Sequence, residues 1–340
     1  MVTIRDVAKE SGFSSTTVSI VLNDAPLARY IPPVTKKRIE KAAEKLGYRP
    51  NQLARGLRTG KTKTIGLIVE NISNAFFATL AKSIEDEAKR YDYKVVYCST
   101  DNDEEKARDL INMLSQRQVD GYIITPTLNL AEDIRKLQAE NKPVVLIDRY
   151  FPQHNEIPAV LVDNYEGVSR GMEYLFSKGY QKIALVTIET EMAHMKDRLR
   201  AYCDVLNHHG VASQDRIVKI VPYNSDHEAA LTAVTELLRD AGKTFDAVFF
   251  LTNYLGVLGI EAIKKLQIKV PQQLAVLCFD DNDIFRLYTP TISVIRQPIE
   301  AIGQRAMGVL IERLRHTGEE VYVESPPARL TADLVKRESI

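Results

Sequence analysis

Residues 3–24 read TIRDVAKESGFSSTTVSIVLND, which is the pattern of two short helices joined by a turn. Val7 and Ala8 recur at helical spacing in the first half, and Gly12 suits the positive φ of a tight turn. Ser14 can then cap a second helix through its side-chain oxygen. Two helices of about eight residues around such a turn predict a helix-turn-helix.

A third helix is predicted over residues 35–46, where Ile39, Ala42 and Ala43 form one apolar side. Three short amphipathic helices can enclose a core in about 45 residues, which is close to the lower limit for an independent fold. Residues 1–48 are therefore expected to form a small all-α head.

Residues 49–62 contain two leucines four positions apart, Leu53 and Leu57, with Arg55 and Arg58 beside them. A short helix that exposes apolar side chains between arginines is typical of a wedge inserted into the DNA minor groove. A plain interdomain linker has a similar composition. The segment is expected to be a hinge, and composition alone leaves both interpretations open.

The chain has zero net charge, with 45 Lys and Arg against 45 Asp and Glu, but this charge is unevenly spread over its 340 residues. Residues 1–63 hold 13 basic and five acidic side chains, a net charge of +8, which leaves −8 on residues 64–340. A basic head on an acidic body is typical of a polyanion-binding module joined to another function. The same charge distribution also fits a basic surface that only contacts solvent, so the function of the head is inferred from its sequence pattern.

Beyond residue 63, short β-branched apolar runs alternate with longer helical stretches such as 77–91 and 103–118. The apolar runs fall in two series, 64–70, 94–100, 121–126 and 144–148, then 182–187, 216–221, 247–252 and 274–280. Such alternation predicts right-handed βαβ units and parallel sheets. We expect an α/β body of two doubly wound lobes with a ligand cleft at the carboxyl ends of their strands. No glycine-rich phosphate-binding motif follows a first strand, which argues against a dinucleotide or ATP site.

Composition excludes several classes of protein. Apolar residues make up 45% of the chain, and no stretch approaches the roughly 18 apolar residues of a membrane-spanning helix. The charged N-terminus lacks the apolar segment of a signal peptide. Cys98, Cys203 and Cys278 are far apart, which argues against a disulfide framework or a zinc site and favours the reducing cytoplasm. We expect no metal, no other cofactor and no membrane partner.

The segments TIRDVAKESGFSSTTVSIVLND and TKKRIEKAAEKLGYRPNQLARGL resemble the DNA-binding head of the LacI/GalR (lactose-repressor) family. The likeness continues through VVLIDR, FDDNDIFRLYTPTISVIRQP and ARLTADLVKRES to the end of the chain. It implies a cytoplasmic transcriptional regulator with a helix-turn-helix head, a hinge helix and a periplasmic-binding-protein-like body. It also implies a homodimer that binds a pseudo-palindromic operator. A sugar-like effector is expected to change this DNA affinity, and most members of the family act as repressors.

The resemblance implies which head residues contact DNA. Ser15 and Thr16 lead the recognition helix, and Leu57 is the minor-groove wedge. Ile20 stands where many members carry arginine, so a bidentate guanine contact is not expected there. Any one of the serines and threonines could instead cap or solvate a surface helix. The predicted DNA-binding set is Thr3, Ser14, Ser15, Thr16, Thr17, Ser19, Asn23, Asn51, Ala54, Arg55, Leu57 and Arg58.

Strand-end positions and the resemblance together predict the effector site. Asp280 and Asn253 follow apolar runs and suit hydrogen bonds to a polyol, and Arg198 falls at the family's effector-binding arginine. The two phenylalanines of the set could stack on a ring or belong to the core, and its histidine could be a satisfied surface group. Tyr254 stands where the family usually has Asp. The predicted effector-binding set is Phe76, Phe77, Asp148, His194, Arg198, Tyr223, Asn253 and Asp280.

The resemblance further implies three crossings between the lobes, near 161, 291 and 320. The body, residues 63–340, then divides into lobe 1, about 63–161 and 291–320, and lobe 2, about 162–290 and 321–340. Two alternatives use the same two-lobe fold. A solute-binding protein would need a signal peptide in place of the basic head. A sugar-modifying enzyme would need a catalytic arrangement, and the sequence shows no Ser–His or Cys–His set.

Overall fold

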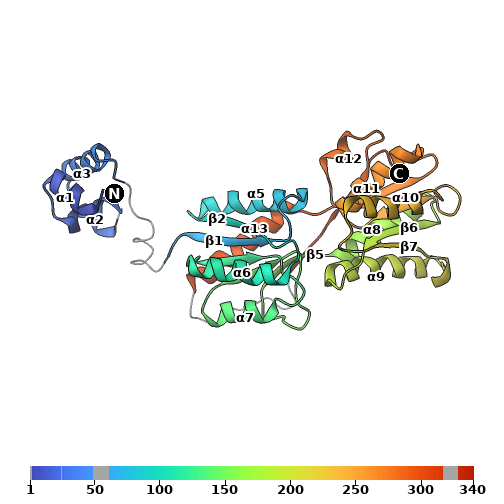
Figure 1. Ribbon diagram of the computed structural model, residues 1–340, viewed down its shortest axis with the longest axis horizontal. Helices are drawn as coiled ribbons and strands as arrows, with labels where there is room; N and C mark the ends of the chain where they lie inside the picture. The colour runs from blue at the N-terminus through green and yellow to red at the C-terminus, as the bar shows by residue number, and fades with distance from the viewer. Residues whose placement is uncertain (1, 24, 49–60, 317–327) are drawn as a thin grey trace. The chain divides into compact units, whose positions relative to one another are not determined.

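The computed structural model describes residues 2–23, 25–48, 61–316 and 328–340. The chain divides into two compact units, Met1–Lys63 and Thr64–Ile340 (Figure 1). The predicted hinge helix lies outside the described residues, as do five predicted DNA-binding residues, namely Asn51, Ala54, Arg55, Leu57 and Arg58.

The first unit contains the predicted helix-turn-helix and third helix. Its elements are α1 (Ile4–Ser11), α2 (Ser15–Leu22), the 3₁₀ helix η1 (Pro26–Tyr30) and α3 (Pro33–Lys45). Gly12 ends α1 with φ 77°, as the turn requires. Helix α3 begins two residues before the predicted start because the fixed φ of Pro33 suits a first helical turn. The small core consists of Val7, Ala8, Val18, Val21, Ile39, Ala42 and Ala43.

Thr3 and Asp6 form a capping box at the start of α1. The backbone N–H of Thr3 donates to Asp6 Oδ2 at 2.8 Å, and the Thr3 hydroxyl donates to the same oxygen at 2.7 Å. These hydrogen bonds lower the pKa of Asp6. The Asp6 carboxylate therefore satisfies the backbone N–H of the N-cap residue Thr3 and stabilises the first turn.

Lobe 1 of the second unit is an α/β layer structure. Its strands are β1 (Thr64–Val69), β2 (Lys94–Ser99), β3 (Gly121–Ile124), β4 (Val144–Ile147), β5 (Ala159–Val162) and β11 (Ala328–Leu330). Its helices are α5 (Ala75–Arg90), α6 (Glu104–Gln116), α7 (Ala131–Ala139) and α13 (Ile299–Arg315). The strands are parallel in the order β11-β5-β4-β3-β1-β2, with α5 on one face and α6 and α7 on the other (Figure 1).

Lobe 2 repeats this plan. Its strands are β6 (Ile183–Ile188), β7 (Ile217–Val221), β8 (Ala247–Phe250), β9 (Ala275–Phe279), β10 (Ser293–Arg296) and β12 (Asp333–Val335). Its helices are α8 (Asn164–Ser177), α9 (Ala193–His208), η2 (Ser213–Asp215), α10 (His227–Leu238), α11 (Asn253–Leu266) and α12 (Asp283–Leu287). The order is β12-β10-β9-β8-β6-β7, and β12 is antiparallel to β10, so this sheet departs from the predicted purely parallel arrangement at one edge.

The second and third crossings between the lobes lie later than the predicted 291 and 320. Strand β10 pairs with β9, so the chain stays in lobe 2 up to Arg296. Strand β11 pairs with β5 of lobe 1, and β12 pairs with β10 of lobe 2, which places the third crossing between residues 330 and 333. These strands span only three or four residues, so their hydrophobic pattern is too short to identify their sheet. The first crossing, after Val162, lies close to the predicted 161.

The central strands explain the apolar runs of the sequence. Every residue of β3, β4, β5 and β8 is buried because helices cover both faces of these sheets. Polar side chains are therefore displaced to the strand ends, where the cleft forms. No helix in the described ranges is long and apolar enough to cross a lipid bilayer.

Candidate functional site

The carboxyl ends of both sheets border one cavity of about 580 Å³ within the second unit. Lobe 1 contributes the segments after β1 and β4, and lobe 2 contributes those after β6, β7, β8 and β9. All eight predicted effector-binding residues line it, namely Phe76, Phe77, Asp148, His194, Arg198, Tyr223, Asn253 and Asp280. Residues that are far apart in the chain, predicted from strand-end position and the family resemblance together, thus lie around a single cavity.

Two aspartates occupy equivalent places at the ends of β4 and β9. Asp148 and Asp280 both have a left-handed backbone, with φ of 65° and 72°. This conformation is uncommon for a residue other than glycine, although aspartate tolerates it better than most. Strained backbone of this kind concentrates at functional sites. Here it accompanies two carboxyl groups in the cavity wall, one from each lobe.

Arg198 of α9 interacts electrostatically with both carboxyl groups and is only 3% exposed. Its Nε donates to Asn164 Oδ1 at 2.8 Å, and its Nη1 donates to the carbonyl of Leu251 at 2.6 Å. The guanidinium also stacks on the Phe279 ring, 3.6 Å from its centroid. Nη2 has no hydrogen bond within the part of the chain that the structure describes. The arginine is thus held rigidly and keeps donors available for a ligand.

Burial dominates the electrostatics of the cavity. It raises the pKa of Asp148 to about 7, although the positive charge of Arg198 opposes this rise. The pKa of Asp280 is raised by the same cause, against Arg198 and a hydrogen bond from Gln297 Nε2 at 2.6 Å. His194 has a pKa well below its usual value because it is buried beside cations, so it is neutral.

The aromatic pair at the start of α5 belongs both to the cavity wall and to the core. Phe76 and Phe77 are 6% and 4% exposed and meet edge to face with centroids 5.0 Å apart. Asn74 caps the helix by accepting from the backbone N–H of Phe76 at 3.0 Å. Both rings belong to the core and also line the cavity, and their stacking on a ligand ring stays a prediction.

Two hydrogen bonds link the lobes directly across the cavity. Asn253 Nδ2 donates to Asn74 Oδ1 at 3.0 Å, and the Tyr223 hydroxyl donates to Glu70 Oε1 at 3.3 Å. Tyr254, which departs from the family pattern, also lines the cavity and is 42% exposed. The cleft is therefore bridged by polar side chains from both sheets.

Several polar groups of the cavity lie outside the predicted set, among them Arg149, which the sequence offers only as a weaker candidate, Glu70 and Gln297. Arg149 is buried and donates to Glu70 Oε2 and, at 2.5 Å, to Asn102 Oδ1. Its Nε also lies 3.4 Å from Asp148 Oδ2. Gln297 follows β10, beyond the point where the crossing was predicted, and Glu70 was read as the last residue of the first strand. Glu70 directly follows an apolar run, which was an available signal, whereas Arg149 and Gln297 each follow another polar residue, Asp148 and Arg296.

The Asp148→Asn variant is expected to weaken effector binding but to stabilise the fold at alkaline pH. Between pH about 4 and 7 the folded state retains a proton that the unfolded state loses, so Asp148 costs stability as pH rises through this window. Asparagine tolerates the same left-handed backbone. We expect Tm to rise by about 2–4 °C at pH 8, corresponding to about 1 kcal/mol, with a smaller gain at pH 5. A lower Tm at pH 8 would show that Arg198 outweighs burial.

Seven predicted DNA-binding residues of the head are described, and five of them make hydrogen bonds within the head. Four make hydrogen bonds within α2 or at its ends: Ser14 accepts from Thr17, and Asn23 donates to Ser19. Thr3 is engaged at the start of α1. Ser15 and Thr16 are exposed in the first turn of α2, and within the described residues their side chains make no hydrogen bond. They are the candidates free to meet base edges.

The side chains of Ile20 and of the loop after α2 range from buried to largely exposed. Ile20 is half-buried, although it is not one of the described side chains that form or pack against the head core. The loop forms η1, in which Ala28 is buried and anchors the segment while Tyr30 is 70% exposed. Arg29 lies over the Tyr30 ring, 4.7 Å from its centroid.

Comparisons with known proteins agree with this architecture. The family described as "Bacterial regulatory proteins, lacI family" matches residues 3–51, and "Periplasmic binding proteins and sugar binding domain of LacI family" matches residues 62–334. Catabolite control protein A of Priestia megaterium is 32% identical over 328 residues, covering 96% of each chain. The ribose operon repressor of Halalkalibacterium halodurans is 30% identical, covering 97% of this chain and 96% of the relative.

A solved structure, the lac repressor dimer bound to operator and an anti-inducer, matches with a TM-score of 0.83 at 21% identity. The match covers 99% of this chain and 98% of that one and supports the fold. These relatives carry the names of regulators, which disfavours the solute-binding and enzymatic alternatives. The chain belongs to the LacI family of bacterial regulatory proteins and is a DNA-binding transcriptional regulator rather than an enzyme.

Proposed function

We propose that two copies of the chain bind a pseudo-palindromic operator in the cytoplasm and that an uncharged polyol, such as a sugar, changes this affinity from the interlobe cavity. The proposal assigns residues 1–48 to DNA binding, 49–62 to the hinge and 63–340 to effector binding and dimerisation. The observation that carries it is the convergence of all eight predicted residues on one buried polar cavity, in a chain that also bears a basic helix-turn-helix head.

The charges around the cavity favour an uncharged ligand. Glu70, Asp148 and Asp280 supply three carboxyl groups against the two guanidinium groups of Arg149 and Arg198. Because burial raises the pKa of both aspartates, these acidic and basic groups nearly balance, and a charged ligand would lose its hydration in a poorly solvated site without gaining an unpaired opposite charge. Hydroxyl groups can accept from guanidinium groups and donate to carboxylates, so a polyol satisfies both kinds of partner.

The head supports sequence-specific binding to DNA. Its exposed Ser15 and Thr16 suit base edges in the major groove, while its excess of Lys and Arg suits phosphates. In a two-fold dimer, two such heads read half-sites roughly one helical turn apart, over about 16–20 base pairs. The relative from Halalkalibacterium halodurans is named a repressor, and we propose that this chain also represses transcription.

The cleft provides a means of coupling. The bonds Asn74–Asn253 and Glu70–Tyr223 join the lobes in the described arrangement. A polyol that hydrogen-bonds to both sheets adds contacts available only when the lobes are close together, so it favours that arrangement by its differential affinity. We propose that the resulting change in lobe 1 alters hinge pairing in the dimer, which changes operator affinity.

Selection from random duplex DNA tests the operator part of this proposal. The full chain is expected to enrich a two-fold symmetric site, with an affinity that falls steeply as salt rises. The Ser15→Ala/Thr16→Ala variant is expected to lose about tenfold or more in preference for that site while keeping the same salt dependence. Enrichment of an asymmetric site, or none at any salt concentration, would contradict the proposal.

A further inference from the structure

A second cavity of about 210 Å³ adjoins the one described above. Lobe 1 lines it with Thr127, Tyr150 and Phe151, and lobe 2 lines it with Met192 and Ala193 at the start of α9. Arg149 lines both cavities, so its side chain forms the wall between them. The two cavities therefore form neighbouring compartments of one cleft.

The wall is fixed from the side of lobe 1. Arg149 donates to Asn102 Oδ1 at 2.5 Å, to the Pro126 carbonyl at 3.5 Å and to Glu70. A ligand that reaches both compartments must therefore pass along the lobe 2 side, beside Ala193. An alanine at this position leaves room that a larger side chain would fill.

Buried polar atoms without hydrogen-bond partners gather at this wall. Within the described residues, Thr127 Oγ1 and His194 Nδ1 lack a hydrogen-bond partner, whereas Arg149 Nε, although not hydrogen-bonded, lies 3.4 Å from Asp148 Oδ2. Thr127 is 1% exposed and lines the second compartment, and His194 is 9% exposed and lines the first. Leaving such groups unsatisfied is costly, so their concentration here indicates a polar ligand that satisfies them.

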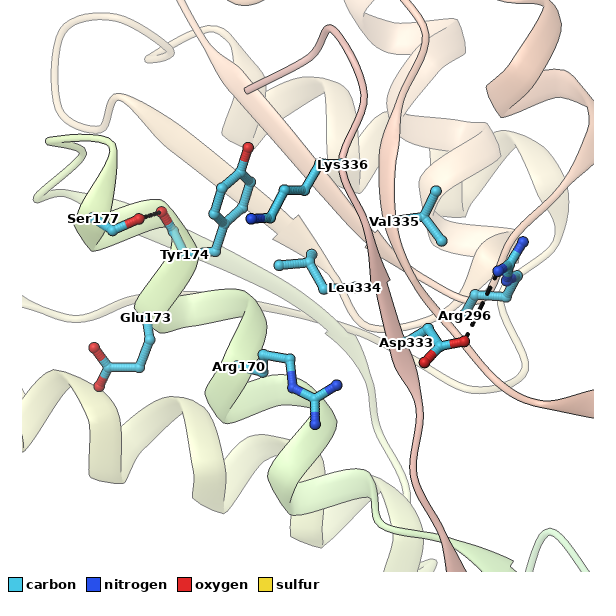
Figure 2. A pocket seen from close by; sticks show the side chains of 9 residues that line it. All are labelled: Arg170, Glu173, Tyr174, Ser177, Arg296, Asp333, Leu334, Val335 and Lys336. Atoms are coloured by element: carbon cyan, nitrogen blue, oxygen red, sulfur yellow. Dashed lines mark hydrogen bonds and ion pairs between the residues drawn. The ribbon is translucent and has the colours of Figure 1, made fainter.

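A larger hollow elsewhere on lobe 2 lacks this feature. It lies between α8 and β12 and is open to solvent (Figure 2). Its charged groups have partners: Arg296 lies 3.9 Å from Asp333, and Arg170 donates to the Ala332 carbonyl at 2.9 Å. Size alone therefore does not identify the ligand site, whereas unsatisfied buried groups favour the cleft.

We propose that the effector is a disaccharide whose second ring occupies the compartment beyond Arg149, an inference that rests on the proposed polyol site. Tyr150, Phe151 and Met192 present apolar surface to the C–H face of a sugar ring, and Thr127 offers a hydroxyl to its polar edge. Lys196 and Glu191, at the border of the compartment, form an ion pair with each other. The compartment thus presents no unpaired charge and suits a neutral ring.

The test measures binding of sugars to the full chain by calorimetry. The probes are cellobiose, maltose, lactose and sucrose, compared with methyl glucosides and a methyl galactoside that retain the glycosidic oxygen but lack the second ring. At least one disaccharide is expected to bind about tenfold or more tightly than its methyl glycoside. The Ala193→Leu variant is expected to remove this advantage while changing methyl glycoside affinity less than about threefold.

Two further variants sharpen the result. Thr127→Val, which is nearly isosteric, is expected to weaken disaccharide binding several-fold through loss of the hydroxyl. Ala229→Leu, an exposed alanine in the first turn of α10, is the matched control and is expected to change neither affinity.

Equal binding of disaccharides and methyl glycosides, or an Ala193→Leu effect that is the same for both, would overturn the second-ring assignment and leave the polyol site intact. Binding of none of these sugars would overturn the proposed polyol effector itself, and the second-ring assignment with it.

Discussion

The Arg198→Met variant is expected to bind effector at least about 100-fold more weakly than the wild type, while operator affinity without effector stays the same. The guanidinium interacts electrostatically with two buried carboxyl groups and retains donors for a ligand. Hydrogen bonds to a charged group contribute about 1.5–3 kcal/mol each, so losing one or two removes most of the affinity. Calorimetry with the sugar that alters operator binding measures the change.

Arg200→Met is the matched control for this variant. Arg200 lies two residues further along α9, is largely exposed and pairs with Asp197 at 3.0 Å. Its replacement is expected to leave effector affinity unchanged. Since removing a buried arginine also destabilises the fold, Asp280→Asn serves as a second test, and it too should weaken binding. Wild-type effector affinity in a folded Arg198→Met protein would contradict the assignment.

The Ile39→Ala variant is expected to abolish operator binding while leaving effector binding unchanged. Ile39 is fully buried at the centre of the head core. Truncating such a side chain costs about 2–5 kcal/mol, and a core of this size rarely supplies more than about 3–5 kcal/mol. The head should therefore be largely unfolded at 37 °C. Operator affinity is expected to fall at least about 100-fold in a mobility-shift assay.

Val34→Ala provides the comparison within the same helix. Val34 is 79% exposed at the start of α3, so its truncation should change head stability by less than about 0.5 kcal/mol. If Ile39→Ala instead lowered effector affinity as strongly as operator affinity, the head and the body would not fold as independent units. That result would contradict the division of the chain at residue 63.

The fold was largely predictable because its central strands are buried on both faces. Runs such as 121–126 and 247–252 are continuous and apolar, and both contain strands. The short edge strands were not predictable in the same way. Strand β11 has three residues, and only pairing with β5 of lobe 1 places it. Such pairing depends on long-range contacts that a local pattern does not contain.

The cleft was predictable to the extent that it consists of strand ends. Asp148, Asp280 and Asn253 follow apolar runs directly, so their positions alone brought them to the cavity. The partner of Asp280 was not predictable because Gln297 lies beyond a misplaced crossing. The role of Arg149 as a wall between two compartments depends on its bonds to Glu70 and other distant residues, which no spacing in the sequence indicates.

We would first measure operator affinity with and without a saturating disaccharide, by fluorescence anisotropy on the selected operator. This measurement tests whether the interlobe cavity controls DNA binding. We expect the disaccharide to change the operator Kd by about 5–150-fold. Because coupling between two sites is reciprocal, operator should change the disaccharide Kd by the same factor. An operator Kd that stays constant while calorimetry shows the disaccharide bound in the cleft would contradict the claim that this cavity controls DNA binding.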